Sequence, residues 1–209
     1  MQLVVLADES LKKELLSNGK RDEADVEWIE SPDQFSISKK ADVCCDLLFD
    51  GSPGRIEALK NISQTVIINS VVKTLADVEP SFIRINGWPG FLKNATTEAN
   101  CGDEYKMEHA EIFFSAFNKK VEWTPDEPGF ISARIVAMII NEAYLALGEG
   151  VSTKSEIDIA MKLGTNYPYG PFEWAEMIGI KNIYSLLGEL SKTNSRYQPA
   201  MLLEKEATN

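Results

Sequence analysis

Side chains able to do acid–base, redox or metal chemistry are sparse in this chain of 209 residues. The single histidine, His109, falls within a predicted helix over residues 106–118, remote from the end of any predicted strand. The cysteines are Cys44, Cys45 and Cys101; adjacent cysteines do not readily bridge each other, and an odd count is not a disulfide framework. We therefore expect His109 to be a surface or partly buried helix residue, and we expect no metal site.

The elements that must position any site alternate in type through the first half of the chain. Apolar runs predict strands at residues 2–7, 26–30, 42–49, 65–69, 81–86, 97–101 and 121–124. Polar segments with apolar stripes predict helices at residues 9–18, 52–62, 72–78 and 106–118. Strands that alternate with helices are joined by right-handed crossovers in a parallel sheet. The pattern therefore predicts an α/β fold for this half.

The pattern changes at residues 127–134, whose sequence is EPGFISAR. Residues 129–147 then predict a long helix that is apolar on nearly all sides, and such a helix must be covered by its own domain or by a second subunit. The boundary separates a predicted α/β domain, residues 1–126, from a predicted helical domain, residues 127–209.

Further helices are predicted after this long one. Ser152 or Thr153, with Glu156 in the first turn, predicts a capped helix that runs to Leu163 and ends at Gly164. Apolar spacing predicts three more helices, at residues 172–177, 181–190 and 196–205.

Charge limits the classes of partner. The formal net charge is -11 and the pI is about 4.7. Because an acidic surface repels phosphate backbones and anionic lipid headgroups, we expect no nucleic acid and no membrane as partners. No apolar run reaches the roughly 18 residues that span a bilayer, and residues 1–7 lack the basic start of a signal peptide. The sequence favours a cytoplasmic protein.

Three motifs of the second half follow one another in a recognisable order. They are DEPGFISAR at 126–134 with NEA at 141–143, EGV at 149–151 with EIDIAMKLG at 156–164, and YPYGPFE at 167–173 with RY at 196–197. Over about 80 residues, their order and spacing resemble the helical C-terminal domain of the 3-hydroxyacyl-CoA dehydrogenase family. In the first half, ADVCCD at 41–46 and Asn69-Ser70 resemble family segments less closely.

The resemblance implies a fold, a cofactor, an assembly and a reaction. The fold would be a Rossmann-like parallel-sheet domain followed by a helical domain of the 6-phosphogluconate-dehydrogenase C-terminal type. The first domain would bind NAD, the second would form a homodimer, and the reaction would be oxidation of the 3-hydroxyl group of an acyl-CoA by hydride transfer.

The family's NAD positions carry unsuitable residues here. Where the resemblance places a G-x-G-x-x-G turn, the chain reads Ala7-Asp8-Glu9, with no glycine before Gly19. Glycines in that turn let backbone N–H groups reach the pyrophosphate, whereas carboxylates repel it. The other positions carried over are Glu30, as the ribose-binding acid, and Asp46. We expect no cofactor here, or NAD if the family's function is retained.

The family's catalytic positions are also changed. Its histidine base, paired with a glutamate twelve positions later, maps onto Asn86 and Glu98. Asparagine cannot accept a proton at neutral pH, so the base for hydroxyl oxidation is missing. The asparagine that the family carries at the boundary between its two domains maps onto Ala133, next to Arg134.

Three hypotheses follow from these substitutions. The first is a 3-hydroxyacyl-CoA dehydrogenase-like protein of fatty-acid metabolism that lacks NAD binding and hydride transfer and keeps its scaffold for an acyl-CoA-like ligand or a partner. The second is an active NAD-dependent 3-hydroxyacyl-CoA oxidoreductase with a divergent site. The third is a structural dimer subunit. A homodimer through the helical domain is expected in all three.

Overall fold

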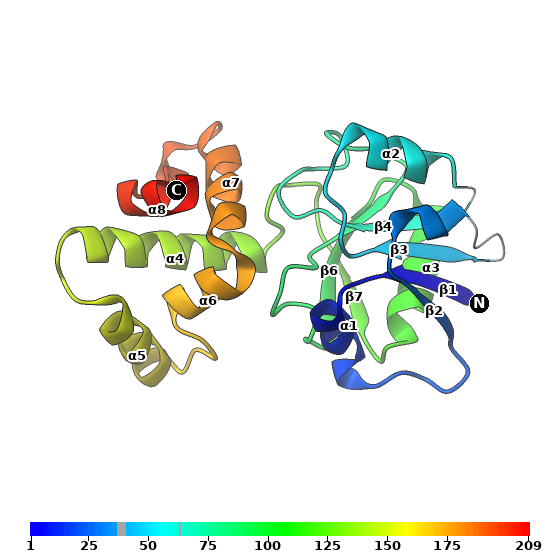
Figure 1. The fold of residues 1–209 in the computed structure, drawn as a ribbon, viewed down its shortest axis with the longest axis horizontal. Helices are drawn as coiled ribbons and strands as arrows, with labels where there is room; N and C mark the ends of the chain where they lie inside the picture. The colour runs from blue at the N-terminus through cyan, green and yellow to red at the C-terminus, as the bar shows by residue number, and fades with distance from the viewer. Residues whose placement is uncertain (37–40, 63) are drawn as a thin grey trace. The chain divides into compact units, whose positions relative to one another are not determined.

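The strands and helices of the chain form two compact units, Met1–Phe130 and Ile131–Asn209. The computed structural model describes residues 1–36, 41–62 and 64–209. The boundary between the units falls inside the stretch 127–134. Figure 1 shows both units along the chain.

The first unit is built on a seven-stranded sheet with the order β2-β1-β3-β4-β5-β6-β7. Its strands are β1 (Gln2–Leu6), β2 (Asp25–Ile29), β3 (Val43–Asp46), β4 (Thr65–Asn69), β5 (Ile83–Ile85), β6 (Thr96–Cys101) and β7 (Lys120–Trp123). All neighbours pair in parallel except β5 and β6, which are antiparallel. The Rossmann-like α/β prediction is confirmed, with one antiparallel pair added.

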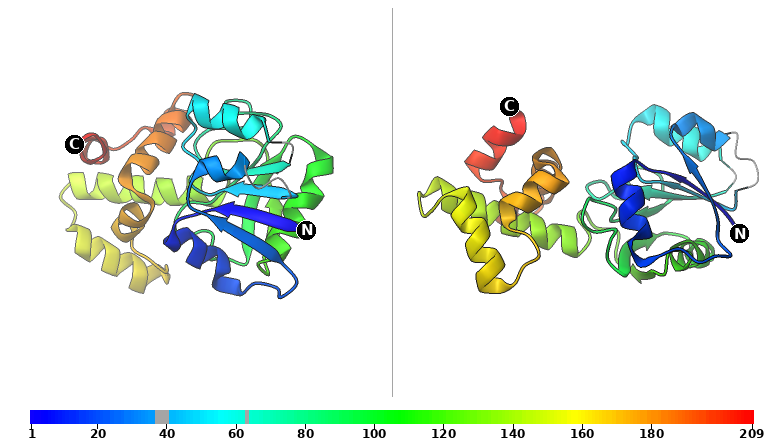
Figure 2. Two further views of the ribbon diagram at one scale, coloured as in Figure 1. Left: turned by 45° about the vertical axis from the view of Figure 1, so that its right-hand side comes forward. Right: turned by 60° about the horizontal axis from the view of Figure 1, so that its bottom comes forward.

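Helices cover both faces of this sheet (Figure 2). One core, from Leu3 and Val5 of β1 to Phe113 and Phe117, packs α1 (Glu9–Leu15) and α3 (Glu104–Ser115) against one face. The other core joins Val4 and Leu6 to α2 (Pro53–Lys60) and to the 3₁₀ turn η2 (Pro32–Ser36). Because successive strand residues point to opposite faces, a strand covered on both sides is a continuous apolar run. Cys44 and Cys45 lie fully buried in such a run.

The helix predicted at residues 72–78 is wrong, since this segment forms turns and bends. Arg84 donates hydrogen bonds to the carbonyls of Ser70 and Lys73. Asp126 accepts from the amides of Leu75 and Ala76. Backbone groups that a helix would pair internally are thus held by distant side chains, which favours turns over a helix in this segment.

The second unit is helical. Its elements are α4 (Ser132–Gly148), α5 (Lys154–Thr165), α6 (Pro171–Ile178), α7 (Ile180–Ser191), the 3₁₀ turn η3 (Ser195–Tyr197) and α8 (Met201–Thr208). Helix α4 packs against α6, α7 and α8. Thr153 caps α5 in a reciprocal capping box with Glu156, as predicted.

Helix α4 begins three residues later than predicted. Gly129 and Phe130 have positive φ angles of 83° and 49°, in the left-handed region that a right-handed helix cannot contain. One face of α4 is buried through Ala133, Ala137 and Ile140, whereas Ile135 stays 55% exposed. The helix is therefore covered on one side by its own unit and open on the other.

Candidate functional site

The carboxyl ends of the parallel strands meet at one edge of the sheet. The register aligns Leu6 with Ile29 and with Asp46, and Asn69 with Ile85. The strand order reverses between β1 and β3, because β2 lies on the other side of β1. Ligands of open α/β sheets bind outside the carboxyl ends at such a reversal. This edge is the candidate site of the first unit.

Asn86 and Glu98, twelve residues apart, are brought together at this edge. Asn86 Nδ2 donates to Glu98 Oε2 at 2.9 Å, and the backbone N–H of Asn86 donates to the carbonyl of Glu98 at 3.0 Å. Asn86 is buried and Glu98 half-buried. The amide therefore occupies the position that the family resemblance assigns to a base, with its acidic neighbour in hydrogen-bond contact.

The turn between β1 and α1 is closed by a carboxylate. Asp8 caps α1, and its Oδ1 accepts from the N–H of Leu11 at 2.8 Å. The side chain of Glu9 is exposed and lies 3.7 Å from Lys12, and Ala7 is half-buried. A helix N-terminus binds phosphate through its free N–H groups. Here an acidic side chain takes one of those donors and adds negative charge.

Asp46, at the end of β3, forms an ion pair inside the sheet unit. It is fully buried, and its Oδ2 lies 2.7 Å from Nε of Arg55 on α2. Burial raises the pKa of the Asp46 carboxyl, and the hydrogen bond and charge of Arg55 oppose that shift. Glu30, at the end of β2, is exposed, and its N–H donates to Gln34 Oε1 at 2.8 Å. The carboxylate of Asp46 therefore neutralises Arg55.

Asn69 ties three segments of the edge together, a role that the sequence analysis missed. Its Nδ2 donates to the carbonyls of Leu47 and Gly87, and its Oδ1 accepts from the N–H of Gly87. A Cβ at position 87 would lie 2.7 Å from Cγ of Asn69, so only glycine fits there. The signal was a polar residue ending an apolar strand. Its amide fills the edge between the turns after β3 and β5.

A buried guanidinium holds the end of the first unit, and this was missed too. Arg84 on β5 is fully buried, with Nε 2.7 Å from Oδ1 of Asp126. The guanidinium carbon of Arg84 lies 4.1 Å from the ring centre of Phe130. Arg84 Nη2 also donates a hydrogen bond to the carbonyl of Glu127. The signal was a charge inside the apolar run FIRI. Arg84 fixes residues 126–130 to the sheet.

Ala133 lies in the second unit, fully buried on α4. Near it, the start of α4 borders an apolar hollow of about 300 Å³, which we call the α4 hollow. It is lined by Ile131, Ser132, Ile135, Val136, Ile139, Tyr167, Pro168 and Trp174. The hollow has room and apolar walls for a short hydrocarbon chain.

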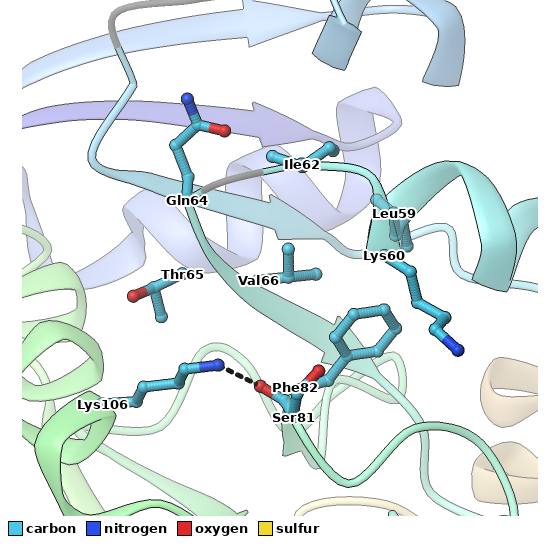
Figure 3. Close-up of a pocket in the computed structure, with 9 residues that line it drawn as sticks. All are labelled: Leu59, Lys60, Ile62, Gln64, Thr65, Val66, Ser81, Phe82 and Lys106. Atoms are coloured by element: carbon cyan, nitrogen blue, oxygen red, sulfur yellow. Dashed lines mark hydrogen bonds between the residues drawn. The ribbon is translucent and has the colours of Figure 1, made fainter.

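Another hollow, of about 150 Å³, lies at the opposite edge of the sheet, near the start of β4 and β5 (Figure 3). Lys60 and Lys106 border it, and Lys106 Nζ donates to the carbonyl of Ser81 at 2.6 Å. Nearby on α3, the half-buried His109 shares a 2.6 Å hydrogen bond with Thr65 Oγ1. These groups bond to the protein itself, so the hollow does not extend the candidate site.

Within residues 1–36, 41–62 and 64–209, no group of three or more histidine, cysteine or acidic side chains is arranged to hold a metal ion. The helices of the same ranges also include none with the length and apolar character needed to cross a bilayer.

The fold defines a class: a Rossmann-like sheet unit followed by a helical unit. Residues 129–208 match the family model described as 3-hydroxyacyl-CoA dehydrogenase, C-terminal domain. The match covers the helical unit, which is thus similar to the C-terminal domain of 3-hydroxyacyl-CoA dehydrogenases.

Curated relatives match part of the chain. A 3-hydroxyadipyl-CoA dehydrogenase of Escherichia coli K12 is 46% identical over 91 residues, covering 43% of this chain and 19% of that protein. A 3-hydroxybutyryl-CoA dehydrogenase of Bradyrhizobium diazoefficiens is 39% identical over 105 residues, covering 49% of this chain and 36% of that protein. The chain thus spans well under half the length of these relatives.

A solved structure matches the whole chain. The (S)-3-hydroxybutyryl-CoA dehydrogenase of Ralstonia eutropha superposes with a TM-score of 0.75 over 99% of this chain and 93% of that one, at 19% identity. At that identity the match establishes the fold of both units.

Proposed function

We propose that this chain binds an acyl-CoA-like ligand on a 3-hydroxyacyl-CoA dehydrogenase scaffold and does not transfer hydride to NAD. The observation that carries the proposal is the hydrogen bond of 2.9 Å between Asn86 Nδ2 and Glu98 Oε2. Removal of a hydroxyl proton needs a base in contact with it, and a carboxamide is not one at neutral pH. Asn86 therefore takes the base position without supplying its chemistry.

The residues at the sheet edge do not fit NAD. Asp8 caps the helix at which a pyrophosphate would bind, and no glycine in that turn lets the backbone approach it. Asn69 fills the space between neighbouring turns with its own hydrogen bonds. NAD therefore has no part in the proposed function.

The ligand is assigned from the apolar lining of the helical unit. The α4 hollow is bordered by Ile135 and Ile139 of α4, by Ile131 just before that helix, and by Tyr167 and Trp174. Apolar area removed from water contributes roughly 25 cal/mol per Å², which suits the hydrocarbon part of an acyl thioester. The relatives act on acyl-CoA compounds, as their names state.

The helical unit also supports a homodimer. Leu163 and Ile159, one turn apart on α5, are 83% and 50% exposed. Exposed apolar side chains at i and i+4 on one helix form a stripe that a second copy would cover. Neither Ile159 nor Leu163 lines the α4 hollow.

Turnover and binding assays test the ligand proposal together. With acetoacetyl-CoA and NADH, or 3-hydroxybutyryl-CoA and NAD, we expect no change in NADH absorbance. Calorimetry with millimolar NAD should give no binding heat, whereas a short-chain acyl-CoA should raise the melting temperature, since a ligand that binds only the folded state stabilises it. Clear turnover would favour the active oxidoreductase; no shift with any CoA compound would favour a structural subunit.

Light scattering tests the dimer. A mass near twice the 23.3 kDa of the chain is expected, and Leu163→Glu should reduce it to the monomer value. Tyr105→Glu, at a 91% exposed position in the first unit, is the matched control and should leave the dimer intact. A monomeric unmodified protein contradicts this part of the proposal.

A further inference from the structure

The last strand of the sheet, β7, has a free edge. The strand order ends with β7, which pairs with β6 on one side. The N–H groups of Lys120 and Thr124 donate to carbonyls on that side. Because alternate residues of a strand direct their backbone groups to opposite edges, those of Val121 and Trp123 face away from β6. These outward groups have no hydrogen-bond partner within residues 1–36, 41–62 and 64–209.

The side chains of β7 alternate between charged and apolar. Lys120 and Glu122 are exposed on one face of the strand, whereas Val121 and Trp123 are half-buried against the core of the sheet unit. Neither Lys120 nor Glu122 forms an ion pair or a side-chain hydrogen bond in the part of the chain that the structure describes. A cation and an anion thus lie two residues apart on the same face of the free edge.

Two copies of β7 are complementary when they run antiparallel about a two-fold axis at Val121. Lys120 of each copy then lies opposite Glu122 of the other. The outward groups of Val121 exchange two hydrogen bonds across the axis, and the N–H of Trp123 meets the carbonyl of Lys119. Lys120 and Glu122 occupy non-hydrogen-bonded positions, where side chains lie closest and opposite charges stabilise the pair.

The neighbouring registers lack this complementarity. A two-fold axis at Glu122 places that carboxylate opposite its own copy, and like charges directly opposite destabilise a strand pair. An axis at Trp123 brings Val121 opposite Pro125, which has no N–H group to donate. The match of charge and backbone at one register identifies the occupant of this edge as a second copy of the chain.

We propose that β7 is a self-association edge, on which two sheet units join through antiparallel β7 strands with two Lys120–Glu122 ion pairs. This edge belongs to the first unit and the α5 stripe to the second, so it joins chains in a step beyond the homodimer of the helical unit. Because β7 has four residues and short, charged edge strands associate weakly, the step depends on protein concentration.

Sedimentation over a concentration series tests the edge in the Leu163→Glu variant, which removes the helical-unit dimer. This variant is a monomer at low concentration, and its mass should rise towards two chains as concentration increases. Adding Lys120→Glu places like charges at both pairs and should raise the dissociation constant about tenfold. Adding Lys120→Glu with Glu122→Lys restores opposite charges and should restore association. Lys13→Glu makes the same charge change at an exposed position of α1 and should have no effect.

The outcomes separate this inference from the helical-unit dimer. A mass that stays at one chain throughout the series overturns the inference, and so does an unchanged association in the Lys120→Glu variant. Failure of the charge exchange to restore association also overturns it, because the two charges then do not pair across the edge. If Leu163→Glu is still a dimer at low concentration, Lys120→Glu decides: a monomer assigns that dimer to β7, and an unchanged mass at every concentration overturns the inference.

Discussion

The two units use their polar side chains differently. In the first unit, Asp8, Asp46 and Asn69 stand at the sheet edge where a ligand would bind, and each bonds to a neighbouring part of the protein. In the helical unit, polar side chains hold turns away from the α4 hollow: Asp158 Oδ1 accepts from the N–H of Phe172 at 2.8 Å. Asn141 joins the carbonyl of Gln198 to the N–H of Ala200.

This difference accounts for where the family resemblance is strong. The family model matches residues 129–208, where glycine, proline and capping residues determine the helix connections. The sheet unit keeps its fold through apolar runs whose register does not depend on the site residues. A Rossmann-like sheet can therefore lose its site residues and retain its topology, whereas the helical unit cannot change its turns as freely.

The largest effect should come from Arg84→Met, which would break the hold on residues 126–130. The change leaves Asp126 without its cation and frees carbonyls that Arg84 now binds. Breaking a buried ion pair from one side costs about 3 to 5 kcal/mol. Urea unfolding should show that loss, while Arg21→Met, at an exposed position, should change stability by less than about 0.5 kcal/mol. Equal effects would mean that Arg84 does not organise the unit.

Gly170→Ala tests the turns of the helical unit. A Cβ at position 170 would lie 2.3 Å from Cγ of Asp158, so the hydrogen bond to Phe172 must be displaced. We expect a loss of about 2 to 3 kcal/mol. In Gly164→Ala the new Cβ has no atom within 4 Å, and the helix should gain about 0.5 to 1 kcal/mol. Thermal unfolding of both variants measures the contrast; a tolerated Gly170→Ala would remove the structural reason for the motif.

The buried side chain of Lys119 should make the free energy of unfolding of the sheet unit depend on pH. Burial lowers the pKa of its ammonium group from 10.5 to about 8, against the opposing effect of Glu14. Between these values the unfolded chain binds more protons, so the free energy of unfolding should rise with pH, by about 2 kcal/mol from pH 8 to 10. Lys119→Met should remove the rise and Lys120→Met, at an exposed position, should not. A flat profile in the unmodified protein would contradict the shift.

The smallest effect is expected from Asn86→His. The variant supplies an imidazole beside Glu98, but the Asp8 cap still closes the cofactor turn. We expect NADH formation to stay at the background of Asn86→Ala. Measurable turnover with NAD would contradict the proposal that this turn excludes the cofactor and would show that only the base is missing from the sheet unit.

The sequence predicted the structural features that depend on local residue pattern and on the burial of apolar side chains. Continuous apolar runs located β1, β3 and β4. The family resemblance paired Asn86 with Glu98, which lie in hydrogen-bond contact. The roles of Arg84 and Asn69 depend on partners up to 43 residues away, which no local pattern reports. The hydrogen bonds from Arg84 to Lys73 and from Leu75 to Asp126 hold the backbone of residues 72–78 in turns, where a helix was predicted.

Some predicted helix boundaries were wrong because of local backbone geometry. Helix α4 starts late because Phe130 is in the left-handed region. The helix predicted at 196–205 divides into η3 and α8, because Pro199 lacks an N–H group and disfavours a helical conformation at the residue before it. Of the two adjacent acids at the start of α1, Asp8 is the N-cap and Glu9 lies in the first turn, an assignment that depends on the backbone geometry there.

The positions of the cysteines make thiol labelling a measure of unfolding in the sheet unit alone. All three lie in the sheet unit, and burial raises the pKa of Cys44 to about 12. Burial also raises the pKa of Cys45 and of the half-buried Cys101. A thiol reagent attacks the thiolate, so the folded sheet resists labelling at Cys44 and Cys45. The rate of their modification therefore measures the opening of the sheet, whatever the state of the helical unit.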